Sequence, residues 1–111
     1  VVQIVPKEGT YDYENKYKPG AVTETCPAPI SPELTEKLQD AAVAGYHALE
    51  MEGYARLDFI VTEDEKLYCL EANTLPGMTP TSLIPQEAAV LGMDYPTLCE
   101  ELIRVSMKKY E

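Results

Sequence analysis

The sequence predicts an α+β fold in which helices pack on a small antiparallel sheet. The sheet is predicted by two runs of β-branched, aromatic or apolar residues, 54–61 and 66–72, separated by a polar cluster at 62–65. The helices are predicted by Ser31 and Asp94, each a capping residue followed within two positions by proline. A chain of 111 residues is long enough for one modest domain with its own core.

The elements before the sheet are a short strand, a long loop and a helix. Apolar residues at the start predict a strand over 1–6, and the polar segment 7–30 is predicted to be a loop. Loops of that length are uncommon in a compact domain unless they cover a site or are disordered. A stripe of apolar residues at helical spacing predicts a helix over 31–52, and Gly53 is placed to end it.

The elements after the sheet are a loop and two helices. Residues 74–83 form a loop rich in Gly, Pro and Thr that leads into a short helix over 82–91, with Gly92 as its stop signal. Residues 95–110 form the last helix, whose apolar positions turn inward and whose basic tail suits the negative end of the helix dipole.

The hairpin over 54–73 carries the polar residues that indicate chemistry. Side chains alternate along a strand, so Arg56 and Asp58 share one face, and Glu71 and Asn73 share one face. A loop at 63–66 is a common hairpin length. It pairs Arg56 with Asn73, Asp58 with Glu71, and the last apolar position of the first strand, Val61, with Tyr68. The opposite face is then the predicted core face, made of Leu57, Phe59, Val61, Tyr68, Leu70 and Ala72.

This pairing predicts a metal site. Asp58 directly opposite Glu71 is a like-charge pair, which is destabilising by itself. A hard cation such as Mg²⁺ reverses that effect, because it prefers carboxylate, amide and phosphate oxygens. We therefore expect Asp58, Glu71 and Asn73 to be metal ligands. The alternative is a hairpin with one solvated polar face, where single acidic residues are usually found.

The composition argues against several classes of function. The chain has 9 basic and 19 acidic residues, a formal charge of −10, and no visible basic patch for nucleic acid. An acidic surface disfavours anionic membranes, and no apolar run reaches transmembrane length. The cysteines lack zinc spacing and read as free thiols in a reducing compartment, so we expect a cytoplasmic protein. The start without methionine suggests a piece of a longer chain.

Three segments resemble the D-alanine–D-alanine ligase family. They are YDYENKY at 11–17, ARLDF at 55–59 and LEANTLPGMTPTSL at 70–83. Their order and spacing agree with the family along essentially the whole chain, and the one departure is Asn15 where alanine is common. The resemblance implies an ATP-grasp C-terminal subdomain over 1–111. The partners it implies are ATP, D-alanine and a missing N-terminal domain of the same chain.

The resemblance also implies a reaction. ATP phosphorylates the carboxylate of one D-alanine, the amine of a second D-alanine attacks the acyl phosphate, and phosphate leaves. The product, D-alanyl-D-alanine, serves peptidoglycan synthesis, cell-wall biogenesis and cell shape. Two Mg²⁺ ions, which Mn²⁺ can replace, bridge the ATP phosphates. The intact enzyme is an ADP-forming ligase that can be a homodimer.

By resemblance, the site residues take the following roles. Asp58 and Glu71 hold one Mg²⁺, and Glu71 and Asn73 hold the other, so Glu71 also serves the ATP site. Arg56 and the backbone N–H of Gly77 stabilise the tetrahedral oxyanion.

The two loops flank this cluster. In the lid loop 7–30, Lys16 contacts phosphate and Tyr17 closes the loop over the site, although without the resemblance an ordinary surface loop is favoured. In the substrate loop 74–83, Ser82 and the N–H of Leu83 bind the carboxylate of the second D-alanine at a helix start, where anions are favoured.

Two alternatives stay open. The first is another ATP-grasp carboxylate–amine ligase that adds D-serine or D-lactate, although the pattern around Lys16 and Tyr17 favours D-alanine. The second is a folded module without turnover, which is what we expect of the isolated 111-residue chain.

Overall fold

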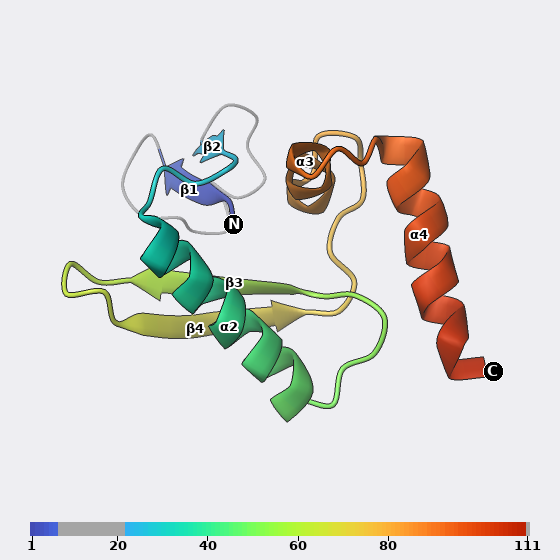
Figure 1. The fold of residues 1–111 in the computed structure, drawn as a ribbon, viewed down its shortest axis with the longest axis horizontal. Helices are drawn as coiled ribbons and strands as arrows, with labels where there is room; N and C mark the ends of the chain where they lie inside the picture. The colour runs from blue at the N-terminus through green and yellow to red at the C-terminus, as the bar shows by residue number, and fades with distance from the viewer. Residues whose placement is uncertain (7–21, 111) are drawn as a thin grey trace.

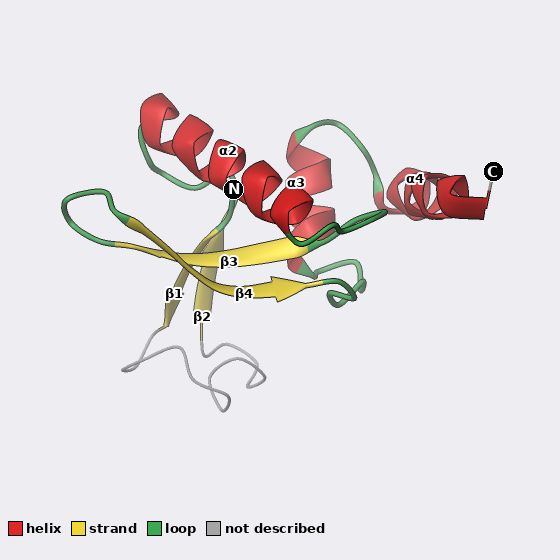
Figure 2. Ribbon diagram, turned by 90° about the horizontal axis from the view of Figure 1, so that it is seen from below, coloured by secondary structure: helices red, strands yellow, loops and turns green. Residues whose placement is uncertain are grey.

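The computed structural model describes residues 1–6 and 22–110 and confirms an α+β fold (Figures 1 and 2). The described segments contain paired strands, longer helices and one short 3₁₀ turn. In chain order these elements are β1 Gln3–Pro6, β2 Val22–Thr25, α2 Pro32–Ala48, β3 Arg56–Val61, β4 Leu67–Asn73, α3 Leu83–Val90, α4 Tyr95–Met107 and η1 Lys108–Tyr110.

The strands form two separate antiparallel ribbons instead of one small sheet. One ribbon is β3 with β4, as predicted, and the other is β1 with β2, in which Gln3 pairs with Thr25. The prediction of a continuous loop over 7–30 is therefore wrong at residues 22–25. A short polar strand has little local signal, and its pairing with β1 depends on residues far away in the sequence.

The helix predicted over 31–52 corresponds to α2, which is shorter at its end. The Ser31 hydroxyl accepts a hydrogen bond from the N–H of Leu34 at 3.1 Å, as expected of a cap. At the other end Glu50 has a φ of 54°, and the N–H of Met51 bonds to the carbonyl of Tyr46 at 3.0 Å. This is a Schellman motif in which Glu50 occupies the left-handed position. The helix consequently stops before Gly53, the residue expected to end it.

The helix α2 covers one face of the β3–β4 ribbon (Figure 2). Leu38 is its buried contact, and the ammonium group of Lys37 donates to the carbonyl of Glu65 in the hairpin turn at 2.6 Å. A Cβ added to Gly45 would lie 2.7 Å from Cδ2 of Leu57, so the helix approaches the strand closely at this point. The missing side chain of Gly45 thus leaves room for the end of the Leu57 side chain.

The register of the hairpin shifts near its turn. Asp58 pairs with Glu71, but the next residue, Phe59, pairs with Cys69, so Leu70 is an extra residue in a β-bulge. Val61 consequently pairs with Leu67, and the predicted pairing of Val61 with Tyr68 is wrong.

The bulge also changes which side chains face the core. Tyr68 now lies opposite Ile60, and both side chains are 52% exposed, while Leu70 is 62% exposed. Tyr68 and Leu70 are therefore not core residues, contrary to the prediction. A bulge reverses the alternation of faces beyond it, and nothing in the alternating pattern itself reveals where it occurs.

The last two helices contact each other at the end of the molecule away from the hairpin turn (Figure 1). The helix α3 ends at Val90, and two residues later Gly92 has a φ of 83°, the left-handed conformation predicted for its stop. The Asp94 carboxylate caps α4 by accepting from the N–H of Thr97 at 2.9 Å, and Leu98 is 5% exposed. None of the described helices is long and apolar enough to cross a membrane.

The close approach at Gly45 leads to a prediction. Gly45→Val in the intact protein should lower the free energy of unfolding by about 1–3 kcal/mol, because the added methyl groups overlap Leu57. Urea denaturation measures the change. Ala44→Val, at the neighbouring exposed position, is the control for the helix propensity of valine. Equal losses in the two variants would show that the helix–strand contact is not tight.

Candidate functional site

The predicted polar cluster lies at the end of the hairpin nearest the 74–82 loop. The ladder pairs Asp58 with Glu71 and Arg56 with Asn73, which is the pairing predicted from the sequence. Counted from the turn, where Val61 pairs with Leu67, the extra residue Leu70 is what brings Asp58 opposite Glu71. Side chains from neighbouring strands thus meet on one face of the ribbon.

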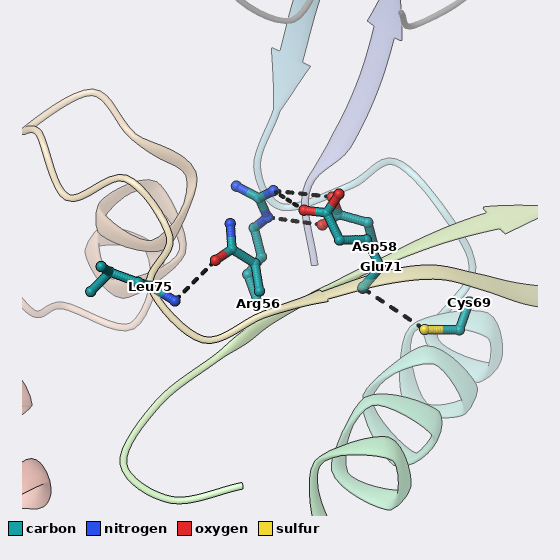
Figure 3. A network of polar contacts seen from close by, with 6 residues as sticks. Arg56, Asp58, Cys69, Glu71 and Leu75 are labelled. Carbon is teal, nitrogen blue, oxygen red and sulfur yellow. Dashed lines mark hydrogen bonds and ion pairs between the residues drawn. The ribbon is translucent and has the colours of Figure 1, made fainter. Parts of the chain in front are cut away.

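The Arg56 guanidinium joins the carboxylates (Figure 3). Its Nε and Nη2 atoms donate to the Asp58 carboxylate oxygens at 2.8 and 3.1 Å, which is a bidentate contact. Nη2 is also 3.6 Å from Oε1 of Glu71. The side chains of Arg56 and Asp58 are 15% and 24% exposed, and that of Glu71 is 45% exposed. The like charges of Asp58 and Glu71 are therefore offset by the positive charge of the Arg56 guanidinium.

Asn73 links the hairpin to the following loop. Its side-chain oxygen accepts a hydrogen bond from the N–H of Leu75 at 2.9 Å, which forms an Asx turn (Figure 3). Pro76 follows and is buried. A carboxamide oxygen has two lone pairs, so this turn leaves acceptor capacity on Asn73.

The loop then folds back on itself between Gly77 and Ser82. The Thr79 N–H donates to the Ser82 hydroxyl at 3.0 Å, and the two hydroxyl groups lie 2.8 Å apart. A Cβ added to Gly77 would lie 3.4 Å from Oγ of Ser82. Ser82 precedes α3, yet its side chain makes no capping bond and belongs to the loop instead. The structure thus brings together Gly77, Ser82 and the first residue of α3, Leu83.

Two side chains from later helices hold this loop, and the sequence analysis did not find them. The Tyr95 hydroxyl, in the first turn of α4, donates to the carbonyl of Met78. In α3, the Gln86 amide donates to the carbonyl of Thr81 and to the Glu24 carboxylate of β2, both at 3.0 Å. Because Tyr95 and Met78 are separated by 17 positions, no local spacing could have revealed their contact.

Tyr95 stays protonated in this environment. Desolvation is the larger cause and a hydrogen bond with the Cys99 thiol the next, and both raise the pKa of Tyr95 above its ordinary range. A phenol with a raised pKa remains a hydrogen-bond donor at neutral pH.

The donor set at the hairpin fits a cation that is shared with another ligand. The described residues contain no group of three or more His, Cys, Asp and Glu side chains that could hold a metal ion. The candidates are the carboxylates of Asp58 and Glu71 with the carboxamide of Asn73. Mg²⁺ is commonly bound by one or two carboxylates together with phosphate oxygens and water, so these residues suit such a site. Lys16 and Tyr17 lie outside the described residues.

Comparison with known proteins identifies relatives along nearly the whole chain. A D-alanine–D-alanine ligase of Desulfotalea psychrophila is 53% identical over 98% of the chain, and one of Halalkalibacterium halodurans is 48% identical over 98%. The aligned part is 34% and 36% of these two relatives. The chain therefore spans about a third of the length of the curated relatives it matches.

Solved structures agree with this relationship. A D-alanine–D-alanine ligase of Bacillus anthracis complexed with ATP superposes with a TM-score of 0.72 at 37% identity, over 80% of this chain and 31% of that one. The VanG D-Ala:D-Ser ligase of Enterococcus faecalis gives a TM-score of 0.76 at 30% identity, over 94% of this chain and 30% of that one. The family model described as D-ala D-ala ligase C-terminus matches residues 1–104, and the chain belongs to this family.

Proposed function

We propose that this chain is the C-terminal catalytic part of an ATP-dependent ligase that joins two D-alanines. The observation that carries the proposal is the contact of Arg56 with Asp58 and Glu71, immediately beside the loop that brings Gly77 to Ser82. Family membership and the similarity to a ligase complexed with ATP support it. The remaining ATP contacts would come from the N-terminal domain of the same chain.

The proposed reaction has two steps. The γ-phosphoryl group of ATP passes to a carboxylate oxygen of the first D-alanine, which gives ADP and an acyl phosphate. The amine of the second D-alanine then forms a C–N bond to the acyl carbon. The C–O bond to phosphate breaks, phosphate leaves with the bonding electrons, and the nitrogen loses a proton. The product is D-alanyl-D-alanine.

Arg56 and Gly77 would act on the negative charge that develops at the acyl oxygen. The bidentate contact with Asp58 holds the guanidinium in one orientation, and a preorganised positive group is more effective than one that must reorient. The Gly77 N–H would donate to the same oxygen from the loop. Removing one such donor commonly costs about 100- to 1,000-fold in rate.

Asp58, Glu71 and Asn73 would hold two Mg²⁺ ions, with Mn²⁺ as a substitute. When bound, these ions neutralise phosphoryl oxygens during transfer. The carboxylates of Asp58 and Glu71 supply charge and the Asn73 carboxamide a neutral oxygen, which is a donor set that suits Mg²⁺.

Ser82 and Leu83 would bind the carboxylate of the second D-alanine. The Ser82 hydroxyl can accept from both the N–H and the hydroxyl of Thr79 and still donate its own proton. Leu83 is the first residue of α3, where backbone N–H groups have no acceptor within the helix and favour an anion.

The rest of the proposal concerns the lid loop, the intact enzyme and the isolated chain. Lys16 would contact phosphate, and Tyr17 would close a lid that keeps water from the acyl phosphate. The intact enzyme would act in the cytoplasm for peptidoglycan synthesis, cell-wall biogenesis and cell shape, as a monomer or homodimer. The isolated 111-residue chain would not turn over.

The role of Glu71 can be tested in the intact enzyme. Glu71→Gln should lower D-alanine-dependent phosphate release by about 100-fold or more, because the amide cannot replace a charged metal ligand. Mn²⁺ binding in the presence of ADP, followed by electron paramagnetic resonance, should weaken in parallel. Asp64→Asn in the exposed hairpin turn is the matched control and should change neither property. Near-normal turnover in Glu71→Gln would reject the metal role.

The similarity to a D-Ala:D-Ser ligase makes D-serine a second candidate for the acceptor substrate. We expect the intact enzyme to use D-alanine as acceptor in preference to D-serine and D-lactate. Dipeptide or depsipeptide formation with each acceptor at equal concentration measures the preference. A higher kcat/KM with D-serine or D-lactate would replace the leading assignment while leaving the ligase chemistry intact.

A further inference from the structure

The start of α4 is held against the substrate loop by a cap and a side-chain hydrogen bond. Gly92 follows α3 in a left-handed turn, and the Asp94 carboxylate then caps α4 through the N–H of Thr97 at 2.9 Å. Tyr95 is the first residue of α4, and its half-buried side chain extends back to the carbonyl of Met78. Leu98, one turn later, is 5% exposed and anchors the helix. The phenol therefore projects from a fixed element toward a loop.

The loop needs such support at its centre. Leu75 is 80% exposed and Gly77 is also exposed, so the buried side chain of Pro76 is the main side-chain restraint on this stretch of backbone. Its other attachments are at its ends, through the Asx turn of Asn73 and the contact of Thr79 with Ser82. The Gly77 N–H and the carbonyl that Tyr95 holds are separated by the planar Gly77–Met78 peptide and by the φ and ψ torsions of these two residues.

We infer that Tyr95 is a positioning residue for the ligation step: by holding the Met78 carbonyl, its hydroxyl keeps the Gly77 N–H directed at the oxygen that becomes negative. This inference rests on the proposed function. It assigns a role to the first turn of α4, which contributes no group to the proposed chemistry itself. A small displacement of an oxyanion donor lowers the rate even when substrates still bind.

The test is Tyr95→Phe in the intact enzyme, which removes one oxygen and keeps the ring. We expect kcat for D-alanyl-D-alanine formation to fall by about fivefold, because the Gly77 N–H is then less well directed at the oxyanion. A factor of this size is typical of one ordinary hydrogen bond. KM for ATP should stay within about twofold, since Tyr95 is proposed to affect the oxyanion donor and not the binding of ATP. Hydrogen exchange in peptides covering 74–82 should become faster.

Tyr110→Phe is the matched control, because its ring is 74% exposed and lies at the opposite end of the α4–η1 segment. Tyr110→Phe should leave kcat and the hydrogen exchange of peptides covering 74–82 unchanged. An unchanged kcat in Tyr95→Phe, with or without a lower melting temperature, would overturn the positioning role while the proposed function stands. An equal rise in KM for ATP would also overturn it, as a sign of general disruption. If the unaltered enzyme forms no dipeptide, both proposals fall together.

Discussion

The contact of the Arg56 guanidinium with Asp58 and Glu71 is the interaction on which the site depends. Carboxylates from adjacent strands would repel each other on one face of the hairpin, and the guanidinium makes that arrangement favourable. Hydrogen bonds to charged groups contribute about 1.5–3 kcal/mol when they are shielded from water. The bidentate contact with Asp58 is the stronger one, because Glu71 is 45% exposed and 3.6 Å away. Arg56 thus organises the carboxylates that are proposed to hold Mg²⁺.

The two ends of the hairpin differ: the end near Asn73 is regular, and the end near the turn is irregular. Near Asn73 the ladder is regular, so the polar side chains stay on one face and lead into the Asx turn. Toward the turn the extra residue Leu70 shifts the register, and the bulge leaves Tyr68 opposite Ile60. Bulges often occur next to functional sites, where they redirect side chains. In this hairpin the bulge begins directly beside Asp58 and Glu71, and the extra residue brings these two opposite each other.

The substrate loop depends on elements from several parts of the chain. The strand β4 supplies the Asx turn, α3 supplies Gln86, and α4 supplies Tyr95. Gln86 also reaches Glu24, which connects the loop to the β1–β2 ribbon. The loop is consequently a point where separate elements meet. That arrangement explains how an exposed, irregular segment can present backbone groups in a defined geometry.

The sequence by itself determined the features that depend on neighbouring residues. Alternation along the strands placed Arg56 and Asp58 on one face, Ser31 and Asp94 marked the helix starts, and Gly92 marked the end of α3. The loop predicted at 63–66 was wrong, because Val61 pairs with Leu67, and Asp58 lies opposite Glu71 only because the bulge adds one residue. The tertiary structure decided the pairing of β2, the bulge at Leu70, the contact of Arg56 with Glu71 and the support of Met78 by Tyr95. Local rules act over about four residues along a helix or across one turn. These other features depend on distant residues that meet only when the chain folds, or on a choice among registers that packing resolves.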